Sequence, residues 1–189
     1  MLPFQAVLRA RRLVLGGPLC LALSACGAFS TFTAPDRPLP VVVPSALFEV
    51  VADKGLNPDE AGQPKPVMLR LYELRATAAF ERSGYLDLQD KDEAPLGADF
   101  VKREEFMFQP GEQRTLERKG HPEVRAFGFL VGYRDLERSR WRTIIAAPNS
   151  VELRRRWWGL GPTELLRPVV YRVTLSRDAI KVELQPPSR

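Results

Sequence analysis

Apolar and polar residues alternate along most of the chain, in short runs that end at turn residues. This period of two is typical of strands that bury one face. It predicts eight strands, over residues 45–52, 67–74, 104–109, 113–118, 124–134, 141–147, 169–175 and 179–184. Alternating strands joined by short turns favour an all-β protein, an antiparallel β-sandwich.

The run 124–134 is the most apolar of these segments. One of its faces carries large residues, and the other carries Ala126, Gly128 and Gly132. Small residues on one face predict a central strand that its neighbours approach closely.

Residues 75–99 break the alternation and predict a small helical insertion. Thr77 is expected to cap a short helix that runs through Phe80, and residues 85–89 are expected to form another helical turn. Four apolar side chains are expected to pack this insertion on the edge of the sandwich: Ala79, Phe80, Leu86 and Leu88.

The connection between the first two strands, residues 53–66, is long for a hairpin, where two to five residues are usual. Its Asn-Pro-Asp sequence at 57–59 favours a fixed turn, and further prolines stiffen the return. Leu56 is its one large apolar residue and is expected to be exposed. A long, stiff loop is a candidate for binding, although a tolerated insertion explains the pattern equally well.

The N-terminus has the order of a secretory signal: arginines at 9, 11 and 12, an apolar run, then small residues. The apolar run is too short to span a membrane as a helix, which needs ~20 residues. Leu23-Ser24-Ala25-Cys26 resembles a bacterial lipobox, which predicts a signal peptide over 1–25 and lipid on Cys26. A plain signal with an incidental cysteine, or a core helix, is the alternative.

Removal of residues 1–25 takes away three arginines and no acid, so the net charge of +5 falls to +2. The basic balance therefore gives little support for nucleic-acid binding. Gly27 follows the lipidated cysteine in place of the aspartate that usually retains such proteins in the inner membrane, which favours the outer membrane. Residues 26–44 are expected to be a proline-rich tether, and 45–189 the sandwich domain.

Candidate chemistry is sparse, because the chain has two cysteines and one histidine. Cys20 leaves with the signal, and His121 stands in a solvated turn. Glu104 and Glu105 are neighbours on a strand, so they point to opposite faces and cannot form a catalytic pair. No nucleophile elbow, phosphate loop or metal motif is found. The sequence therefore argues against an enzyme and predicts no cofactor apart from the covalent lipid.

Residues 154–158 form one basic aromatic segment, with the sequence Arg-Arg-Arg-Trp-Trp, for which two interpretations stay open. It is expected to be a loop with packed tryptophans and solvated arginines, or a contact with lipid phosphates or a partner. Stacking on nucleic acid is disfavoured for an exported protein.

Several weak motifs stand in a characteristic order. They are the lipobox, Leu56-Asn57-Pro58-Asp59, Gly62–Val67, Leu69–Leu74, Leu96–Asp99, Pro110–Glu112 and Gly128–Asp135. Together they resemble the TssJ (SciN-type) outer-membrane lipoproteins of type VI secretion systems. The resemblance implies a transthyretin-like β-sandwich with added helices and no enzymatic activity.

The resemblance also implies a place on the periplasmic face of the outer membrane. The implied partner is the periplasmic C-terminal region of a TssM-like inner-membrane protein, with TssL in the same complex. The family's binding element is the loop between the first two strands, which corresponds to residues 55–65 here. Its candidate binding residues are Gly55, Leu56, Asn57, Pro58, Asp59, Glu60, Gln63 and Lys65.

Two other classes of function stay open. One is a periplasmic lipoprotein sandwich that binds a small ligand or glycan, for which exposed aromatic side chains would be the sign. The other is a lipoprotein hydrolase, against which the missing nucleophile and base argue.

Overall fold

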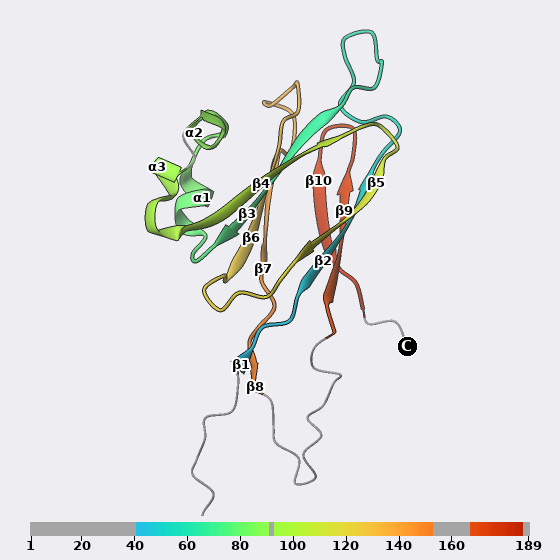
Figure 1. Ribbon diagram of the computed structural model, residues 1–189. Helices are drawn as coiled ribbons and strands as arrows, with labels where there is room; N and C mark the ends of the chain where they lie inside the picture. Colours follow the sequence, from blue (N-terminus) through green and yellow to red (C-terminus); the bar gives the residue numbers. More distant parts are fainter. Residues whose placement is uncertain (1–40, 91–92, 153–166, 187–189) are drawn as a thin grey trace, which may run out of the picture. The chain divides into compact units, whose positions relative to one another are not determined.

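Two four-stranded sheets pack face to face in the computed structural model, which describes residues 41–90, 93–152 and 167–186 (Figure 1). These residues belong to one compact unit, Pro38–Arg189. The first sheet consists, in spatial order, of β10 (Ile180–Leu184), β9 (Val169–Leu175), β2 (Ala46–Ala52) and β5 (Gln113–Arg118). The second consists of β4 (Phe100–Phe108), β3 (Val67–Leu74), β6 (Ala126–Val131) and β7 (Arg142–Ala146).

The eight predicted strands are confirmed, with two differences in their pairing and ends. β2 and β9 run parallel, with Ala46 opposite Val169, while the other neighbouring strands of the two sheets pair antiparallel, as the sequence predicts. β4 begins at Phe100, before the predicted residue 104, and β6 is shorter than the predicted 124–134. Two further strands of two residues, β1 (Val41–Val42) and β8 (Val151–Glu152), pair with each other and were not predicted.

Alternate residues of the strands fill the space between the sheets. In β2 these are Ala46, Phe48, Val50 and Ala52, all 3% exposed or less. The ring of Phe48 crosses the interface and meets the edges of Phe127 and Phe129 at centroid distances of 5.1 and 5.3 Å. Edge-to-face pairs of this kind add to the free energy of burial.

The two adjacent glutamates of β4 do point to opposite faces, as predicted. Glu104 faces the first sheet and accepts a hydrogen bond from Arg118 Nη2 at 2.7 Å. Glu105 faces the outside and accepts one from Arg70 Nε at 2.8 Å. Arg118 is 8% exposed and also lies 3.6 Å from a carboxylate oxygen of Glu73, so this ion cluster closes one margin of the sandwich.

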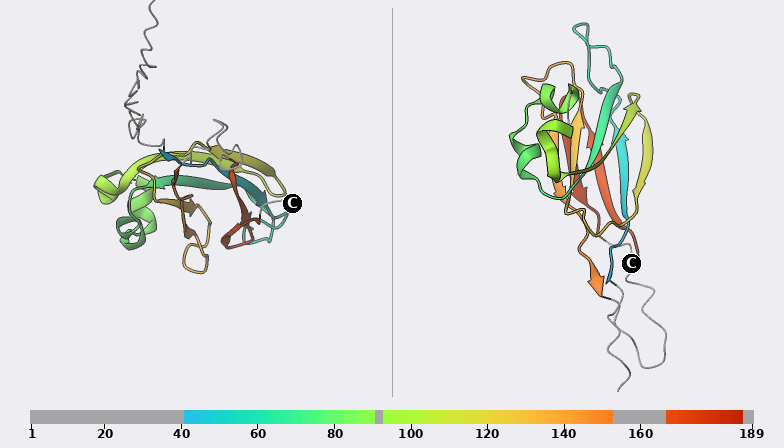
Figure 2. Two further views of the ribbon diagram at one scale, coloured as in Figure 1. Left: turned by 90° about the horizontal axis from the view of Figure 1, so that it is seen from below. Right: turned by 60° about the vertical axis from the view of Figure 1, so that its left-hand side comes forward.

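The helical insertion covers the outer face of the second sheet, and the prediction that it packs on the sheet edge was wrong. Its elements are α1 (Ala78–Arg82), α2 (Tyr85–Asp90), α3 (Glu93–Leu96) and a 3₁₀ turn, η1 (Gly97–Asp99), which Figure 2 shows beside the second sheet. A second apolar cluster joins them to β3 and β6: Tyr72, Leu74, Phe80, Leu88, Leu96, Ala126 and Leu130. Most outward residues of β3 and β6 are apolar, and burying them requires a cover.

Two details of the insertion differ from the prediction. Thr77 stands at the N-cap of α1, but its side chain makes no capping hydrogen bond. Leu86 is 67% exposed, because α2 turns Leu88 toward the sheet instead.

Arginines from the sheet hold the C-terminal ends of the helices. Arg70 Nη1 donates to the carbonyl oxygens of Leu88 and Gln89 at 2.9 and 2.8 Å. Arg142 Nη1 donates to those of Phe80 and Ser83 at 2.8 and 2.9 Å. The last carbonyls of a helix lack partners within the helix and carry partial negative charge, so a guanidinium suits them.

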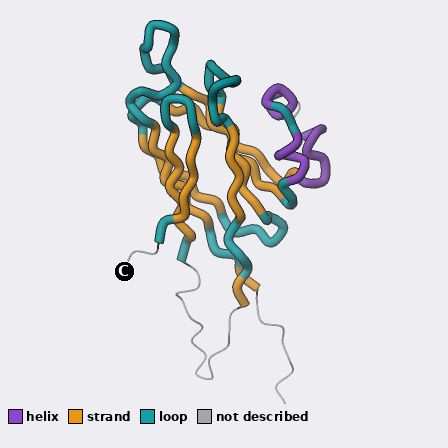
Figure 3. The backbone as a smooth tube through the Cα atoms, turned by 180° about the vertical axis from the view of Figure 1, so that it is seen from behind, coloured by secondary structure: helices purple, strands orange, loops and turns teal. Residues whose placement is uncertain are grey.

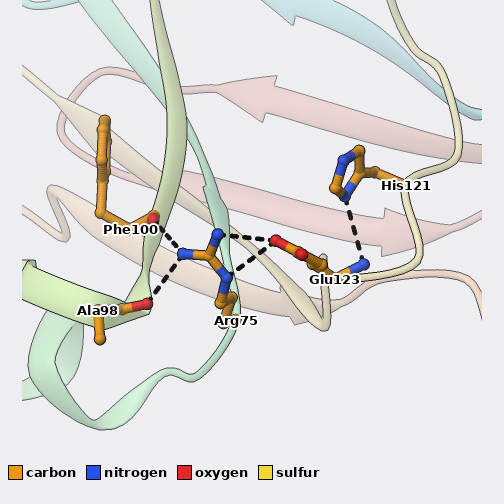
Figure 4. A network of polar contacts seen from close by, with 5 residues as sticks. All are labelled: Arg75, Ala98, Phe100, His121 and Glu123. Carbon is orange, nitrogen blue, oxygen red and sulfur yellow. Dashed lines mark hydrogen bonds and ion pairs between the residues drawn. The ribbon is translucent and has the colours of Figure 1, made fainter.

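The return from the insertion is tied down by Arg75 (Figure 4). Its Nη1 donates to the carbonyls of Ala98 and Phe100, and its Nη2 lies 2.7 Å from a carboxylate oxygen of Glu123. The hydrogen bond and charge of Arg75 lower the pKa of Glu123. His121 is exposed, as predicted, and its Nδ1 accepts a hydrogen bond from Glu123 N.

Gly128 provides a test of how tightly the insertion packs. A Cβ at this position would lie 2.9 Å from Cζ of buried Phe80 and 3.2 Å from Cδ1 of Leu74. We expect Gly128→Ala to lower the free energy of unfolding by ~1–3 kcal/mol, the usual cost of overpacking. Gly55→Ala, where a Cβ would meet nothing within 4 Å, is the matched control. Urea unfolding measures both, and equal stability of the two variants would contradict the packing.

Candidate functional site

Three connections meet at one end of the sandwich: the β2–β3 loop (residues 53–66), the β6–β7 connection (132–141) and the β9–β10 turn (176–179). Figures 1 and 3 show them at the same end, with the β2–β3 loop reaching furthest. This loop is not a long hairpin, because β2 lies in the first sheet and β3 in the second. Its length serves a crossing from one sheet to the other.

Leu56 fixes the base of this loop and is buried, so the prediction that it is exposed was wrong. Its side chain is 0% exposed and belongs to the core between the sheets. Its carbonyl oxygen accepts a hydrogen bond from Lys65 N at 3.0 Å, which closes the base. A chain that crosses over the open end of a sandwich must cover the core there, and Leu56 provides that cover.

Asn57 joins all three connections. Its Nδ2 donates to the carbonyl of Pro66 at 3.0 Å, and its Oδ1 accepts from Arg134 N at 2.9 Å. Its own backbone N–H donates to the carbonyl of Arg177 at 3.0 Å. The residue has φ = 45°, in the left-handed region that asparagine tolerates better than most side chains. Asn57 is 5% exposed, so its role in the free protein is structural.

Beyond this base, residues 58–64 form a tip with its own hydrogen bonds. Asp59 Oδ1 accepts from Gln63 N at 2.8 Å, and its backbone exchanges hydrogen bonds with Gly62 and Gln63. Lys65 Nζ lies 3.0 Å from Asp59 Oδ2, and the hydrogen bond from Lys65 is the main cause of a lowered pKa for Asp59. This clasp is therefore complete above the ordinary pKa of an aspartate and is lost as the pH falls through the lowered value.

The eight candidate binding residues thus fall into two groups. Leu56 and Asn57 are buried in the base, while Gly55, Glu60 and Gln63 are exposed; Pro58, Asp59 and Lys65 are intermediate. The tip, rather than the whole loop, is the surface that a partner can reach.

A cleft beside the tip was missed by the sequence reasoning. It has a volume of ≈ 610 Å³ and is lined by loop residues 57–60 together with residues of the other two connections. Two Arg-Asp pairs in turns, at 134–135 and 177–178, contribute to it. Charged pairs at turns are common, so these residues alone did not indicate a shared site.

The opposite end of the sandwich receives the N-terminal part of the domain. Residues 41–45 lead into β2 there, and a Cβ on Gly120 would collide with the carbonyl of Val43. β8 and the start of β9 lie at this end too (Figure 1). Cys26 and the segment 154–158 lie outside the described residues.

Over residues 41–90, 93–152 and 167–186, no group of three or more side chains is placed to hold a metal ion. The helices of the same ranges are all too short or too polar to cross a membrane.

The model of the T6SS-SciN family, described as type VI secretion lipoprotein with the names VasD, EvfM and TssJ, matches residues 44–185. The chain belongs to this family. The resemblance noted in the sequence is thereby confirmed, and the family is one of structural lipoproteins rather than enzymes.

Solved structures agree with this membership. TssJ1 of Pseudomonas aeruginosa, a type VI secretion lipoprotein, is 34% identical with a TM-score of 0.66, over 77% of this chain and 99% of that one. Lip of Serratia marcescens, a membrane-bound component of the system, is 18% identical with a TM-score of 0.65, over 77% and 100%. A chain in the structure of the TssM C-terminal domain from EAEC is 18% identical with a TM-score of 0.54, over 73% and 99%. The last two likenesses show the fold alone. No curated protein sequence matches.

Two leucines of this TssJ-family lipoprotein test the architecture of the loop. We expect Leu56→Ala to cost ~2–5 kcal/mol of stability, because it leaves a cavity at the end of the core. Leu86→Ala, at a side chain 67% exposed, should change the free energy of unfolding by less than ~0.5 kcal/mol. Chemical denaturation measures the free energy of unfolding of both variants. An unchanged value for Leu56→Ala would contradict the burial of Leu56.

Proposed function

We propose that this protein is an outer-membrane-anchored structural lipoprotein of the type VI secretion membrane complex. In this proposal it binds the periplasmic C-terminal region of a TssM-like inner-membrane protein, with TssL in the same complex. Family membership supports the system and the lipoprotein class. The partner and the outer-membrane position extend beyond that.

The observation that carries the proposal is the separation of the two ends of the domain. The N-terminal segment enters at one end of β2, and the β2–β3 loop leaves from the other (Figure 1). Seven extended residues span ~23 Å. The tip therefore lies at the end of the domain away from residues 41–45, where the segment that follows the proposed lipid anchor enters, and this end is free to meet a periplasmic partner.

The tip also has the properties of a docking element. Its hydrogen bonds hold it in one conformation before any partner arrives, which lowers the entropy lost on binding. Glu60 and Gln63 are exposed and can meet a partner without disturbing the base.

The alternative of a glycan-binding sandwich has no comparable support. In the part of the chain that the structure describes, the large apolar side chains that are well exposed are Leu86, Met107 and Leu184, none of which is aromatic. A stacking platform for sugars is therefore not among them.

The docking proposal predicts the effect of changing the tip alone. Replacement of residues 58–64 by a short Gly-Ser turn, or Glu60→Ala with Gln63→Ala, should weaken binding of the TssM-like periplasmic domain at least tenfold, ~1.4 kcal/mol. The thermal midpoint should stay nearly unchanged, because Leu56 and Asn57 are retained. Residues 38–189 suit this measurement, since they form one compact unit that contains the whole family match of residues 44–185.

Glu81→Ala with Gln89→Ala, exposed on the helical insertion, is the control pair and should bind normally. Full affinity in a folded tip variant would place the docking surface elsewhere.

The anchor is tested at Cys26. Cys26→Ser should yield a protein that is not lipidated, fails to sediment with outer membrane and does not support secretion, while Cys20→Ser leaves the mature form unchanged. Membrane fractionation and mass spectrometry of the mature N-terminus report the result. A processed Cys26→Ser protein that still sediments with outer membrane would rule out the lipobox.

A further inference from the structure

The cleft beside the tip has three walls from three distant parts of the chain. Loop residues 57–60 form one wall, residues of the β6–β7 connection the second, and Arg177 and Asp178 of the β9–β10 turn the third. A second hollow of ≈ 540 Å³ continues from it and shares Arg138, Ser139 and Asp178. Because Asn57 links the three connections by hydrogen bonds, the walls keep a fixed spacing.

Some charged side chains of the cleft have hydrogen bonds or ion pairs within the described part of the protein, and others do not. Of the four acidic side chains on its walls, Asp59 is held by Lys65 and by Gln63 N. Asp135 accepts a hydrogen bond from Arg138 N and lies 3.8 Å from Arg138 Nε. Among the residues that the structure describes, the carboxylates of Glu60 and Asp178 have no hydrogen bond or ion pair.

The basic side chains are less engaged. Among the described residues, no hydrogen bond or ion pair reaches the guanidinium groups of Arg134 and Arg177. Within the described ranges, the Arg138 side chain contacts only Asp135, at 3.8 Å, and is 87% exposed. Arg140 lines the adjoining hollow, again with no such contact in the described part. The uncommitted charge of the two hollows is therefore positive.

Tyr133 adds a second and independent observation. The side chain lines the cleft and is 4% exposed, and its hydroxyl has no hydrogen-bond partner in the part of the chain that the structure describes. Burial, and then the nearby Asp178 and Asp53, raise the pKa of this hydroxyl, so it keeps its proton. A buried donor without an acceptor is costly to a free protein, and an incoming acceptor would remove that cost.

We propose that the cleft binds an acidic segment of the periplasmic partner, with a carboxylate held by the guanidinium groups of Arg134 and Arg177 and hydrogen-bonded to Tyr133. Arginine forks match carboxylates with two parallel hydrogen bonds, which makes the contact strong and directional. Asp178 opposes the same guest and limits its affinity. This assignment rests on the proposed docking function and specifies that the part of the partner bound beside the tip is acidic.

The test uses residues 38–189 and the TssM-like periplasmic domain in calorimetry. Arg134→Glu and Arg177→Glu should each weaken binding at least tenfold, and Asp178→Asn should strengthen it. Arg125→Glu, at an exposed arginine of the opposite end, is the matched control and should leave affinity unchanged. Tyr133→Phe should weaken binding while the thermal midpoint of the free domain stays equal or rises, because the unpaired hydroxyl is gone.

The outcomes separate this proposal from the docking function. If the tip variants lose binding while the arginine variants keep it, the cleft assignment fails and docking stands. Opposite signs at Arg177 and Asp178 would show a cationic guest and overturn the acidic one.

If the partner domain does not bind the unaltered protein, a hexaglutamate peptide and a hexalysine peptide become the probes. Binding of hexaglutamate that Arg134→Glu abolishes supports the cleft without the partner. The absence of hexaglutamate binding overturns it.

Discussion

The position of the exposed tip of the β2–β3 loop depends on one constraint: the chain must cross from the first sheet to the second between β2 and β3. That crossing exposes the end of the core unless something covers it, and Leu56 is buried there. With Leu56 in place, Asn57 lies where its amide and backbone reach the β6–β7 connection and the β9–β10 turn. The exposed tip thus stands on a base that is buried in the core, and hydrogen bonds at Asp59 fix the shape of the tip itself.

The outer face of the second sheet must also be covered, because it too is largely apolar. β6 is buried along its whole length, so both of its faces need partners. The first sheet covers one face and the helical insertion the other, with Phe80 lying against Gly128. The helices are each six residues or shorter and would not be stable alone in water. These short helices are stabilised by packing on the sheet and by hydrogen bonds from the guanidinium groups of Arg70 and Arg142.

The sequence predicted the strands well because residues of different size or polarity alternate along each strand. The packing of large side chains on one face causes this alternation, and it can be seen in the sequence of each strand alone. It did not predict which sheet each strand joins, since the alternation is the same in either. Leu56 was misplaced for a similar reason: a single leucine among polar residues has no periodicity, so only the crossing of the chain explains its burial. The links of Asn57 to Arg134 and Arg177 span long stretches of sequence and leave no local pattern. The cleft, which depends on those links, was therefore out of reach of sequence reasoning.

The links through Asn57 bear on how the tip and the cleft would work together. Surface loops usually move independently, and a partner that touches two of them must order both. Here one residue donates to Pro66 and Arg177 and accepts from Arg134, so the tip and both other walls of the cleft are ordered as a unit before binding. The entropy of that ordering is lost when the domain folds, not when the partner arrives. In the proposed docking, a partner that engages the tip would meet the cleft at a fixed distance, so contacts at the two places would reinforce each other.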